Sequence, residues 1–314
     1  MDRKHSLMPV APLVGIVVVD KPPGLSSAQV VHRLRKILNE DRAGHTGTLD
    51  PLATGVLPIC LNVATKLAGF LIAEDKRYWA QIQLGVATTT LDRVGDVVVQ
   101  ASDAAVAAIS DGDIHQVLQT FLGPSAQVPP MYSAIKVDGM RLYKHARAGD
   151  VIERQPRDIT VHSLCMLARQ GATVELSVHC SKGTYIRSLV DDIGRALGVG
   201  AHVRELRRIA SGRFSIAQAV PIERWTRDEL HAGLISLETA TGLPGIVLDP
   251  GLPGMIERVR NGETMLPDEM RIPEELRHGT HFQVLAQLAP DMAPQLLAIA
   301  HVATYRVRYA RVFR

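Results

Sequence analysis

One run of twelve residues, Gly44 to Gly55, constrains this chain more than any other part of its sequence. It reads GHTGTLDPLATG and places a single carboxylate, Asp50, in a turn rich in glycine and threonine that precedes an apolar segment. Its glycines, Gly44, Gly47 and Gly55, allow positive φ angles or the close approach of a ligand. Pro51 directs Asp50 towards an extended backbone, and a carboxylate held by turns is typical of a site whose reactive atom needs close placement. The run therefore predicts a rigidly presented aspartate, although the same composition alone more often marks an ordinary turn.

The composition is that of an ordinary globular protein with room for more than one unit. At 314 residues, with 46% hydrophobic and 21% charged residues, the chain exceeds one average domain and can bury a large core. The net charge is only +3, so any nucleic-acid surface must come from local clusters of Arg and Lys. We expect one large catalytic unit and a smaller appendage.

The cysteines and the N-terminal segment bear on the compartment in which the chain works. Cys60, Cys165 and Cys180 are widely spaced in largely apolar runs, which predicts buried reduced thiols rather than disulfides or metal ligands. Residues 1–10 lack the apolar core of a signal peptide, and no stretch reaches the roughly 18 apolar residues of a membrane span. We therefore expect a cytoplasmic protein that is neither secreted nor inserted in a membrane.

The hydrophobic pattern predicts strands and helices on both sides of the glycine-rich run. We expect strands at 15–19, 56–61, 76–84, 160–169 and 173–180, and helices that begin at Ser26 or Ser27, at 64 and at 186. Gly198 ends the last helix, and Arg187 in its first turn is unfavourable against the helix dipole, so this arginine is expected to serve a partner. Residues 121–151 combine Gly, Pro, Met and Tyr with several basic residues and predict an exposed excursion.

The last part of the chain predicts a small β module. From about Pro244 onward the sequence is rich in Gly, Pro and Met, and residues 303–314 alternate between basic and larger apolar side chains. If this stretch is a strand, its side chains divide between two faces. Arg306, Arg308 and Arg314 share one face, and Val307, Tyr309 and Phe313 share the other with Arg311.

Four further motifs accompany the run and carry a family resemblance. They are Lys76-Arg77-Tyr78, the segment HCSKGTYIR from His179 to Arg187, Asp20-Lys21-Pro22 and Glu205-Leu206-Arg207-Arg208. Together with the glycine-rich run they resemble, in order and approximate spacing, the TruB family of tRNA pseudouridine synthases. The resemblance covers roughly residues 15–222, and the run resembles the catalytic loop of that family nearly residue for residue.

The resemblance implies a fold and a division into domains. The fold is an α+β pseudouridine synthase fold, in which a central, mainly antiparallel mixed sheet is flanked by helices. The catalytic domain is expected at 11–240, with an RNA-binding thumb at about 121–151. Residues 244–314 are expected to form a small C-terminal β-rich module similar to the PUA RNA-binding barrel of the family.

The resemblance also implies roles for individual residues. Asp50 is the catalytic carboxylate, Tyr78 stacks on the flipped base, and Arg187 pairs with Asp50 and keeps it ionised. Asp92 contacts the same arginine, and His45 fills the gap that the base leaves in the RNA. The other expected substrate contacts are Lys21, Tyr185 and Leu206 around the base, and Lys136, Arg141, Lys144, Arg204, Arg207 and Arg208 along the phosphates. Taken singly, such residues also fit a core tyrosine, a solvated cation or a structural histidine.

The reaction that the resemblance implies needs few chemical parts. It breaks the N1–C1′ bond of a uridine, turns the uracil and rejoins it through C5, without net redox change and without a cofactor or metal. It needs a carboxylate beside the sugar, as nucleophile or base, and a base for the C5 proton. The uridine must also leave the RNA stack to reach that carboxylate. The expected substrate is uridine-55, bound through the T arm and elbow of tRNA by a monomer that uses no guide RNA.

Three alternatives remain open at this stage. A tRNA-binding or folding protein without chemistry is disfavoured because binding alone requires no ionised carboxylate facing anionic RNA, yet Asp50, Tyr78 and Arg187 are all retained. The RNA-guided branch of the same family depends on partner proteins, and the thumb segment and the lack of a long basic tail favour the stand-alone enzyme. A glycosidase that releases uracil is least favoured, since nothing marks a residue placed to activate water.

Overall fold

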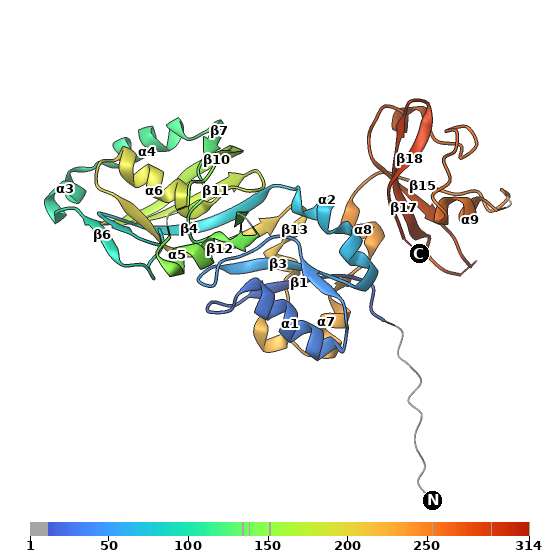
Figure 1. Cartoon of the computed structure of the whole chain (residues 1–314), viewed down its shortest axis with the longest axis horizontal. Coiled ribbons are helices and arrows are strands. Elements are labelled where there is room, and N and C mark those ends of the chain that lie inside the picture. Colours follow the sequence, from blue (N-terminus) through green and yellow to red (C-terminus); the bar gives the residue numbers. More distant parts are fainter. Residues whose placement is uncertain are drawn as a thin grey trace, which may run out of the picture.

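One large mixed sheet runs through the body of the protein (Figure 1). The computed structural model describes residues 12–133, 135–137, 139–150, 152–252, 254–289 and 291–313, so the predictions for residues 1–10 and for Arg314 concern positions outside it. The sheet has the order β14-β1-β3-β12-β4-β11-β10-β7, with β2 paired to β3 and β13 paired to β12. Its strands are β1 (Gly15–Lys21), β2 (Ala43–His45), β3 (Thr54–Leu61), β4 (Lys76–Leu84), β7 (Gly123–Gln127), β10 (Arg157–Gln170), β11 (Thr173–Cys180), β12 (Ala201–Ser211), β13 (Phe214–Ser215) and β14 (Leu234–Ile235).

The pairing of β3 with β12 joins the two halves of this sheet. It is parallel, with Arg207 opposite Thr54 and Arg208 opposite Gly55, whereas the other pairings of the sheet are antiparallel. Gly55 has a φ of +100°, and a Cβ at this position would lie 2.2 Å from the carbonyl oxygen of Arg208. Only glycine allows the backbones to approach so closely at the junction. The predicted α+β fold with a mainly antiparallel mixed sheet is confirmed.

The helices are α1 (Ser27–Leu38), α2 (Ala68–Ile72), α3 (Asp103–Ala108), α4 (Asp111–Thr120), α5 (Leu142–Ala148), α6 (Ile186–Ala196), α7 (Arg227–Ala232), α8 (Leu237–Thr241) and α9 (Met255–Arg260). Most lie around the two halves of the large sheet, whereas α5 contacts residues 140–141 and α9 contacts residues 295–303 (Figure 1). Helix α1 contacts β2 and α7, whereas α6 contacts β12 and α4 contacts β10. The predicted start of the first helix is confirmed, because Ser26 caps α1: its Oγ accepts from the Gln29 amide, and the Gln29 side chain accepts from the Ser26 amide.

Strand β1 shows why the β-branched run at its centre is apolar throughout. Val17 and Val19 face the main core beneath the helices, and Ile16 and Val18 face a second apolar cluster on the opposite side. All four side chains are fully buried. Because both faces of this strand are covered, polar and apolar residues do not alternate along it, and the sequence is a continuous apolar run.

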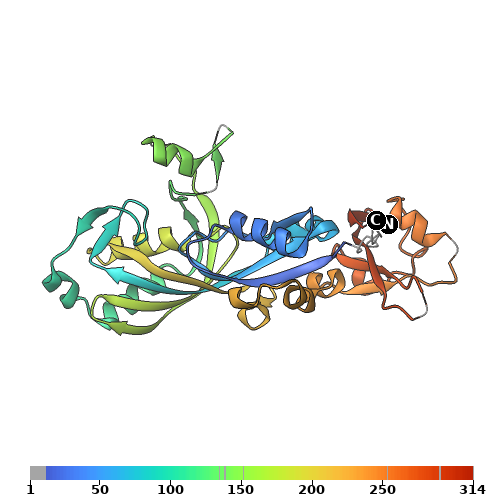
Figure 2. The ribbon, with the colours of Figure 1, turned by 90° about the horizontal axis from the view of Figure 1, so that it is seen from below.

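The excursion after β7 stands away from the body of the protein, as Figure 2 shows for the green segment. Its described part forms the short ribbon of β8 (Lys136–Val137) and β9 (Met140–Arg141), followed by α5. A second small ribbon pairs β5 (Val86–Thr88) with β6 (Val97–Gln100). The predicted excursion at residues 121–151 is therefore confirmed for the described residues that follow β7, whereas residues 123–127 belong to the large sheet.

The C-terminal part forms a second sheet of four strands, so the small β-rich module is confirmed. Its strands are β15 (Gly245–Val247), β16 (Phe282–Ala286), β17 (Gln295–Ala303) and β18 (Arg306–Val312). One face of this sheet packs on its own core, which includes Phe282, Val284 and Val307. The other face contributes Leu296 and Ile299 to the cluster that also contains β1 side chains. The C-terminal sheet is thus held against the large sheet by apolar contact.

Two expectations for single residues are wrong. Phe313 does not share a face with Val307 and Tyr309, because a bulge between Ile299 and Ala300 of β17 and the facing residues of β18 shifts the alternation, and Phe313 packs in the cluster with β1. Cys165 is exposed rather than buried, since it lies on the part of β10 where the outer face has no covering layer.

Candidate active site

A cavity of about 840 Å³ opens beside the β3–β12 junction. Its walls come from the loop after β2, the first residues of β4, the segment that leads into α6, the inward face of β12 and the excursion. Nine predicted site residues line it: His45, Asp50, Tyr78, Asp92, Arg141, Tyr185, Arg187, Leu206 and Arg208. Sequence segments more than a hundred residues apart therefore meet at one site.

Asp50 lies in a loop that is fixed from both sides. The hydroxyl of Ser27 in α1 accepts from the Leu49 amide at 2.8 Å and donates to the Leu49 carbonyl at 3.0 Å. The Leu49 side chain is buried in the main core, and the Pro51 carbonyl accepts from the Gly24 amide at 2.8 Å. Because Leu49 and Pro51 are both held in place, the loop presents the Asp50 carboxylate in one orientation.

Arg187 holds that carboxylate. Its Nε donates to Asp50 Oδ2 at 2.8 Å, and its two terminal nitrogens donate to the backbone carbonyls of Thr90 at 2.9 Å and Tyr132 at 2.8 Å. The arginine side chain is only 3% exposed, whereas Asp50 keeps 31% exposure towards the cavity. All of these hydrogen bonds of Arg187 go to protein atoms, so its role is to orient Asp50. The other carboxylate oxygen of Asp50 remains free to face a ligand.

Asp92 stands at the edge of this pair. Its Oδ2 lies 3.9 Å from Arg187 Nη1, at the limit of an ion pair. Its Oδ1 accepts from the Thr90 hydroxyl at 2.6 Å and from the Val94 amide at 3.0 Å. Asp92 therefore fixes the turn whose Thr90 carbonyl receives Arg187, and its contact with the arginine is mainly indirect.

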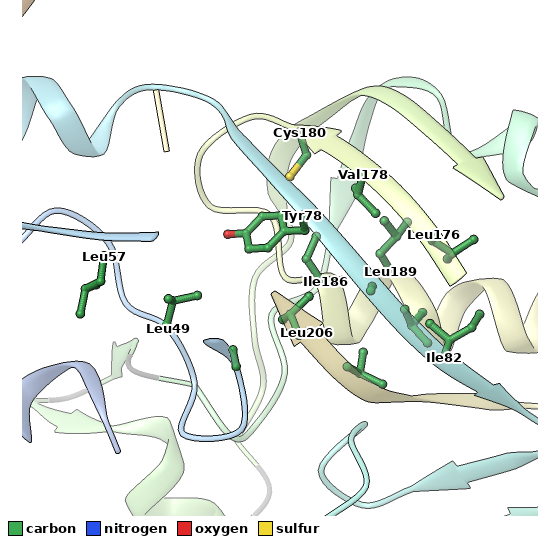
Figure 3. Packing of buried hydrophobic residues seen from close by; sticks show 14 of the residues in the cluster. Leu49, Leu57, Tyr78, Ile82, Leu176, Val178, Cys180, Ile186, Leu189 and Leu206 are labelled. Atoms are coloured by element: carbon green, nitrogen blue, oxygen red, sulfur yellow. The ribbon is translucent and has the colours of Figure 1, made fainter. Parts of the chain in front are cut away.

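Tyr78 forms the apolar wall opposite the loop. In Figure 3 its ring projects from β4 above Ile186 and Leu206, and its hydroxyl points towards the side on which Leu49 lies. Burial raises the pKa of the phenol, while the Arg208 guanidinium, which hydrogen-bonds it, acts in the opposite direction. The hydroxyl therefore stays protonated at neutral pH, next to an apolar surface on which a planar ring can lie.

Tyr185 and His45 occupy two further walls. Gln127, a buried residue of β7, donates to the Tyr185 carbonyl at 3.1 Å and accepts from its amide at 2.8 Å, and so fixes the entry to α6. Burial lowers the pKa of His45, and the charges of Arg208 and Arg141 lower it further. His45 is thus a neutral, half-buried ring at neutral pH.

The remaining predicted residues lie elsewhere. Lys21 is fully buried behind the loop, where its Nζ donates to the carbonyls of Pro22 at 2.8 Å and Pro51 at 3.3 Å. Lys144 is an exposed residue of α5 outside the cavity lining, and the side chain of Lys136 lies outside the described part of the chain.

Comparison with known proteins places the chain in a family. Residues 35–186 match the model described as TruB family pseudouridylate synthase (N terminal domain), and residues 187–233 match the tRNA pseudouridylate synthase B C-terminal domain. The tRNA pseudouridine synthase B of Pseudomonas fluorescens strain Pf0-1 is 51% identical over 209 residues, which are 67% of each chain. The chain belongs to the TruB family of pseudouridine synthases.

One more member of the TruB family and one solved structure extend the match. The tRNA pseudouridine synthase B of Pseudomonas syringae pv. syringae is 50% identical over 218 residues, covering 69% of this chain and 70% of that protein. A crystal structure of a Cbf5-Nop10-Gar1 complex contains a chain that matches with a TM-score of 0.68 and 27% identity, over 96% of this chain and 84% of that chain. The pseudouridine synthase fold of this TruB family member is thus shared with that chain.

Sequence reasoning misplaced one buried cation of this TruB family site and missed a second one. Arg208 is 1% exposed and donates from Nε to the Val56 carbonyl at 2.7 Å and from Nη2 to the Gly47 carbonyl at 3.1 Å. The prediction that it contacts phosphate is wrong, because its guanidinium is enclosed. Lys76 is buried at the cavity wall, where it donates to the carbonyls of Ile72 and Glu74.

The missing signal was the alternation of the strands. Leu206 and Arg208 are two residues apart on β12, as are Lys76 and Tyr78 on β4, and residues two apart share a face. Placing Leu206 and Tyr78 at the site therefore places the two cations there as well. Arg207 takes the opposite face and binds Asp20 with both terminal nitrogens, at 3.1 and 2.6 Å.

We expect Arg208→Met to destabilise this TruB family protein strongly. The substitution leaves the Gly47 and Val56 carbonyls without their charged donor, which is expected to lower the free energy of unfolding by about 2–4 kcal/mol. Urea denaturation of the purified variant measures this. Arg207→Met is the matched control, since that side chain is 36% exposed and its ion pair is expected to contribute at most about 1 kcal/mol. Equal losses in the two variants would contradict this account of Arg208.

We also expect Lys21 to make stability depend on pH. Burial lowers the pKa of Lys21 to about 8, with Asp50 opposing and Arg208 adding to the shift. Between this value and its ordinary 10.5 the unfolded chain holds a proton that the folded chain has released, so the Lys21 contribution to stability rises with pH. The stability of the wild type relative to Lys21→Met should therefore increase from about pH 8 to about pH 10.5 in urea denaturation. A difference in unfolding free energy between the two proteins that stays constant over this pH range would contradict the lowered pKa of Lys21.

None of the helices in the described ranges is long and apolar enough to cross a membrane.

Proposed function

We propose that this chain isomerises uridine-55 in the T loop of tRNA to pseudouridine, without a guide RNA. The observation that carries the proposal is the Asp50–Arg187 pair, held at 2.8 Å inside a cavity with Tyr78 on its wall. The relatives named tRNA pseudouridine synthase B, at about 50% identity, support tRNA as the substrate. The site offers an oriented carboxylate beside an apolar ring, which fits glycosidic chemistry on a flipped base.

The chemistry balances within the nucleotide itself. The N1–C1′ bond breaks, the uracil turns, and a C5–C1′ bond forms. The C5 proton is lost and N1 gains one, so neither an oxidant nor a second substrate enters. Asp50 serves either as the nucleophile at C1′ or as the base that removes a sugar proton, and both roles need it ionised. Arg187 supplies this condition, since a buried guanidinium at hydrogen-bond distance favours the carboxylate form.

The walls of the cavity have complementary roles in this proposal. The side chains of Tyr78 and Leu206 enclose the uracil ring between them, and Tyr185 packs beside it. A flipped uridine leaves a gap in the T loop, and the neutral ring of His45 at the cavity mouth is suited to stacking there. Protonation of His45 would add charge without adding stacking area, so its lowered pKa supports this use.

The excursion supplies phosphate contacts. Arg141 lies on it at the rim of the cavity, and Lys144 is exposed one helical turn further along. Lys136 precedes them in sequence. Cations on a segment that stands off the body can follow the RNA backbone without carrying sequence information themselves.

The domain division and the cellular setting belong to the same proposal. We assign 11–240 to catalysis and 244–314 to a PUA-like RNA-binding module that contacts the tRNA beyond the T loop. The exposed Arg306, Arg308 and Arg311 of β18 support this use of the module. The enzyme is proposed to act as a monomer in the cytoplasm, needing neither cofactor nor metal for the isomerisation.

The test is a reaction with purified protein, unmodified tRNA transcripts and no other macromolecule. Carbodiimide labelling followed by primer extension should map one pseudouridine, at the T-loop uridine, with the RNA mass unchanged. Tight binding without a mark would favour a tRNA-binding protein or a missing guide partner, and loss of uracil mass would favour a glycosidase. Transcripts in which only uridine-55 is replaced by cytidine should give no mark.

A further inference from the structure

A cluster of two histidines and one aspartate lies outside the cavity lining. Asp75 Oδ2 is 3.1 Å from His162 Nε2 and 3.7 Å from His179 Nε2. The two imidazole rings are 4.7 Å apart between centroids, and one ligand atom from each of the three residues lies within 4.8 Å of the others. Among the residues that the structure describes, this is the one group of three His, Cys, Asp or Glu side chains with such spacing.

The fold brings these residues together from three separate segments. Asp75 immediately precedes β4, His162 lies on β10 and His179 on β11. Between Val161 and Ser163 the register of β10 slips by one residue, so His162 is the extra residue of a β-bulge beside His179. Bulges re-aim a side chain that regular pairing would send to the other face. Here the bulge places the second imidazole next to the first.

We propose that Asp75, His162 and His179 bind one Zn²⁺ ion, with water completing the coordination. Ligand atoms about 2.0–2.1 Å from a tetrahedral zinc lie about 3.4 Å from one another. The two distances from Asp75 lie on either side of that value. Two imidazoles and one carboxylate with an open position form a known type of zinc site, and imidazole ligands favour zinc over magnesium or calcium.

The exposure of the cluster suits a metal ion. The side chains of Asp75, His162 and His179 are 46%, 36% and 28% exposed, which leaves a path for the ion. One carboxylate oxygen of Asp75 faces both imidazoles.

The position of the cluster gives the ion a structural role. His179 lies between the buried residues Val178 and Cys180, so its side chain takes the face of the sheet opposite the main core. Asp75 directly precedes Lys76, and the residues after Cys180 line the cavity. A zinc ion would connect the start of β4 to the β10–β11 hairpin. It would lie on the face of β4 and β11 opposite the main core, close to the segments that carry these wall residues. It takes no part in the isomerisation.

Isothermal titration of the metal-free full-length protein with Zn²⁺ tests the proposal. We expect one saturable site per chain, no comparable binding of Mg²⁺, and a loss of affinity of at least about tenfold in His162→Gln, His179→Gln and Asp75→Asn. His162→Gln removes a ligand whose side chain is partly exposed, so the variant is expected to keep its fold. At about a hundredfold excess of zinc over its Kd, the thermal midpoint of the wild type should rise on the order of 5 °C, and that of His162→Gln should not.

Two controls separate this cluster from other metal-binding groups. Cys165→Ser removes the exposed thiol on the same strand, and His278→Gln removes an exposed histidine that pairs with Glu274. Both should bind zinc as the wild type does. The proposal is overturned if the wild type shows no saturable site, if the cluster variants retain its affinity, or if Cys165→Ser abolishes it. Circular dichroism of each variant confirms that lost binding is not lost folding.

Discussion

Replacing Asp50 with asparagine is expected to abolish pseudouridine formation while leaving the fold and tRNA binding in place. The substitution keeps the size of the side chain and an oxygen that can accept from Arg187 Nε, but it removes the negative charge. A neutral amide can neither attack C1′ nor take a sugar proton, so we expect turnover to fall by at least about 10⁴-fold. Single-turnover reactions with tRNA transcripts and filter binding on the same preparation measure the two properties separately.

The matched control for this experiment is Asp96→Asn. Asp96 is an exposed residue in the β5–β6 connection that also carries Thr90, and its hydrogen bonds to Thr89 run through its backbone amide and carbonyl. We expect it to retain wild-type turnover. Residual activity of Asp50→Asn within about tenfold of the wild type would remove Asp50 from the chemistry, whereas lost tRNA binding would indicate that the loop rather than the reaction had been disturbed.

The sequence predicts the strands of the large sheet well where one face meets the core. In β4 and β11 buried residues alternate with more exposed ones, and both strands begin and end where the pattern places them. The junction of β3 with β12 has no such signal, since it pairs residues about 150 positions apart. The bulge in the C-terminal sheet likewise cannot be predicted from the sequence. The prediction for Phe313 assumes that side chains alternate regularly between the two faces of the strand, and the bulge interrupts this alternation.

Some contacts of the candidate site could likewise be predicted from the sequence, and others could not. Motif resemblance brings Asp50 and Arg187 together, and the structure places them in contact. The other two partners of Arg187 are backbone carbonyls, of Thr90 and Tyr132, and any residue type can supply a carbonyl at those positions. The charge of Arg208 suggests a surface position and a phosphate contact, whereas its place two residues from Leu206 on β12 puts its side chain inside.

Replacing Arg187 with lysine, which keeps the charge, is expected to lower kcat by about a hundredfold with little change in KM. The guanidinium serves Asp50, Thr90 and Tyr132 from three nitrogens at once, whereas an ammonium on a flexible stem cannot reach all three directions. Asp50 would then lose its fixed orientation. Because Arg187 is 3% exposed and its hydrogen bonds go to protein atoms, tRNA binding should persist.

Arg195→Lys provides the control for that substitution on the same helix. Arg195 is 73% exposed and pairs with Asp191 one turn earlier, so lysine can replace it at a cost of at most about 0.5 kcal/mol. Steady-state kinetics with T-arm transcripts should show wild-type values for Arg195→Lys and a loss confined to kcat for Arg187→Lys. A rise in KM alone would show instead that Arg187 acts on the RNA, and unchanged kinetics would mean that charge near Asp50 suffices without the three-way geometry.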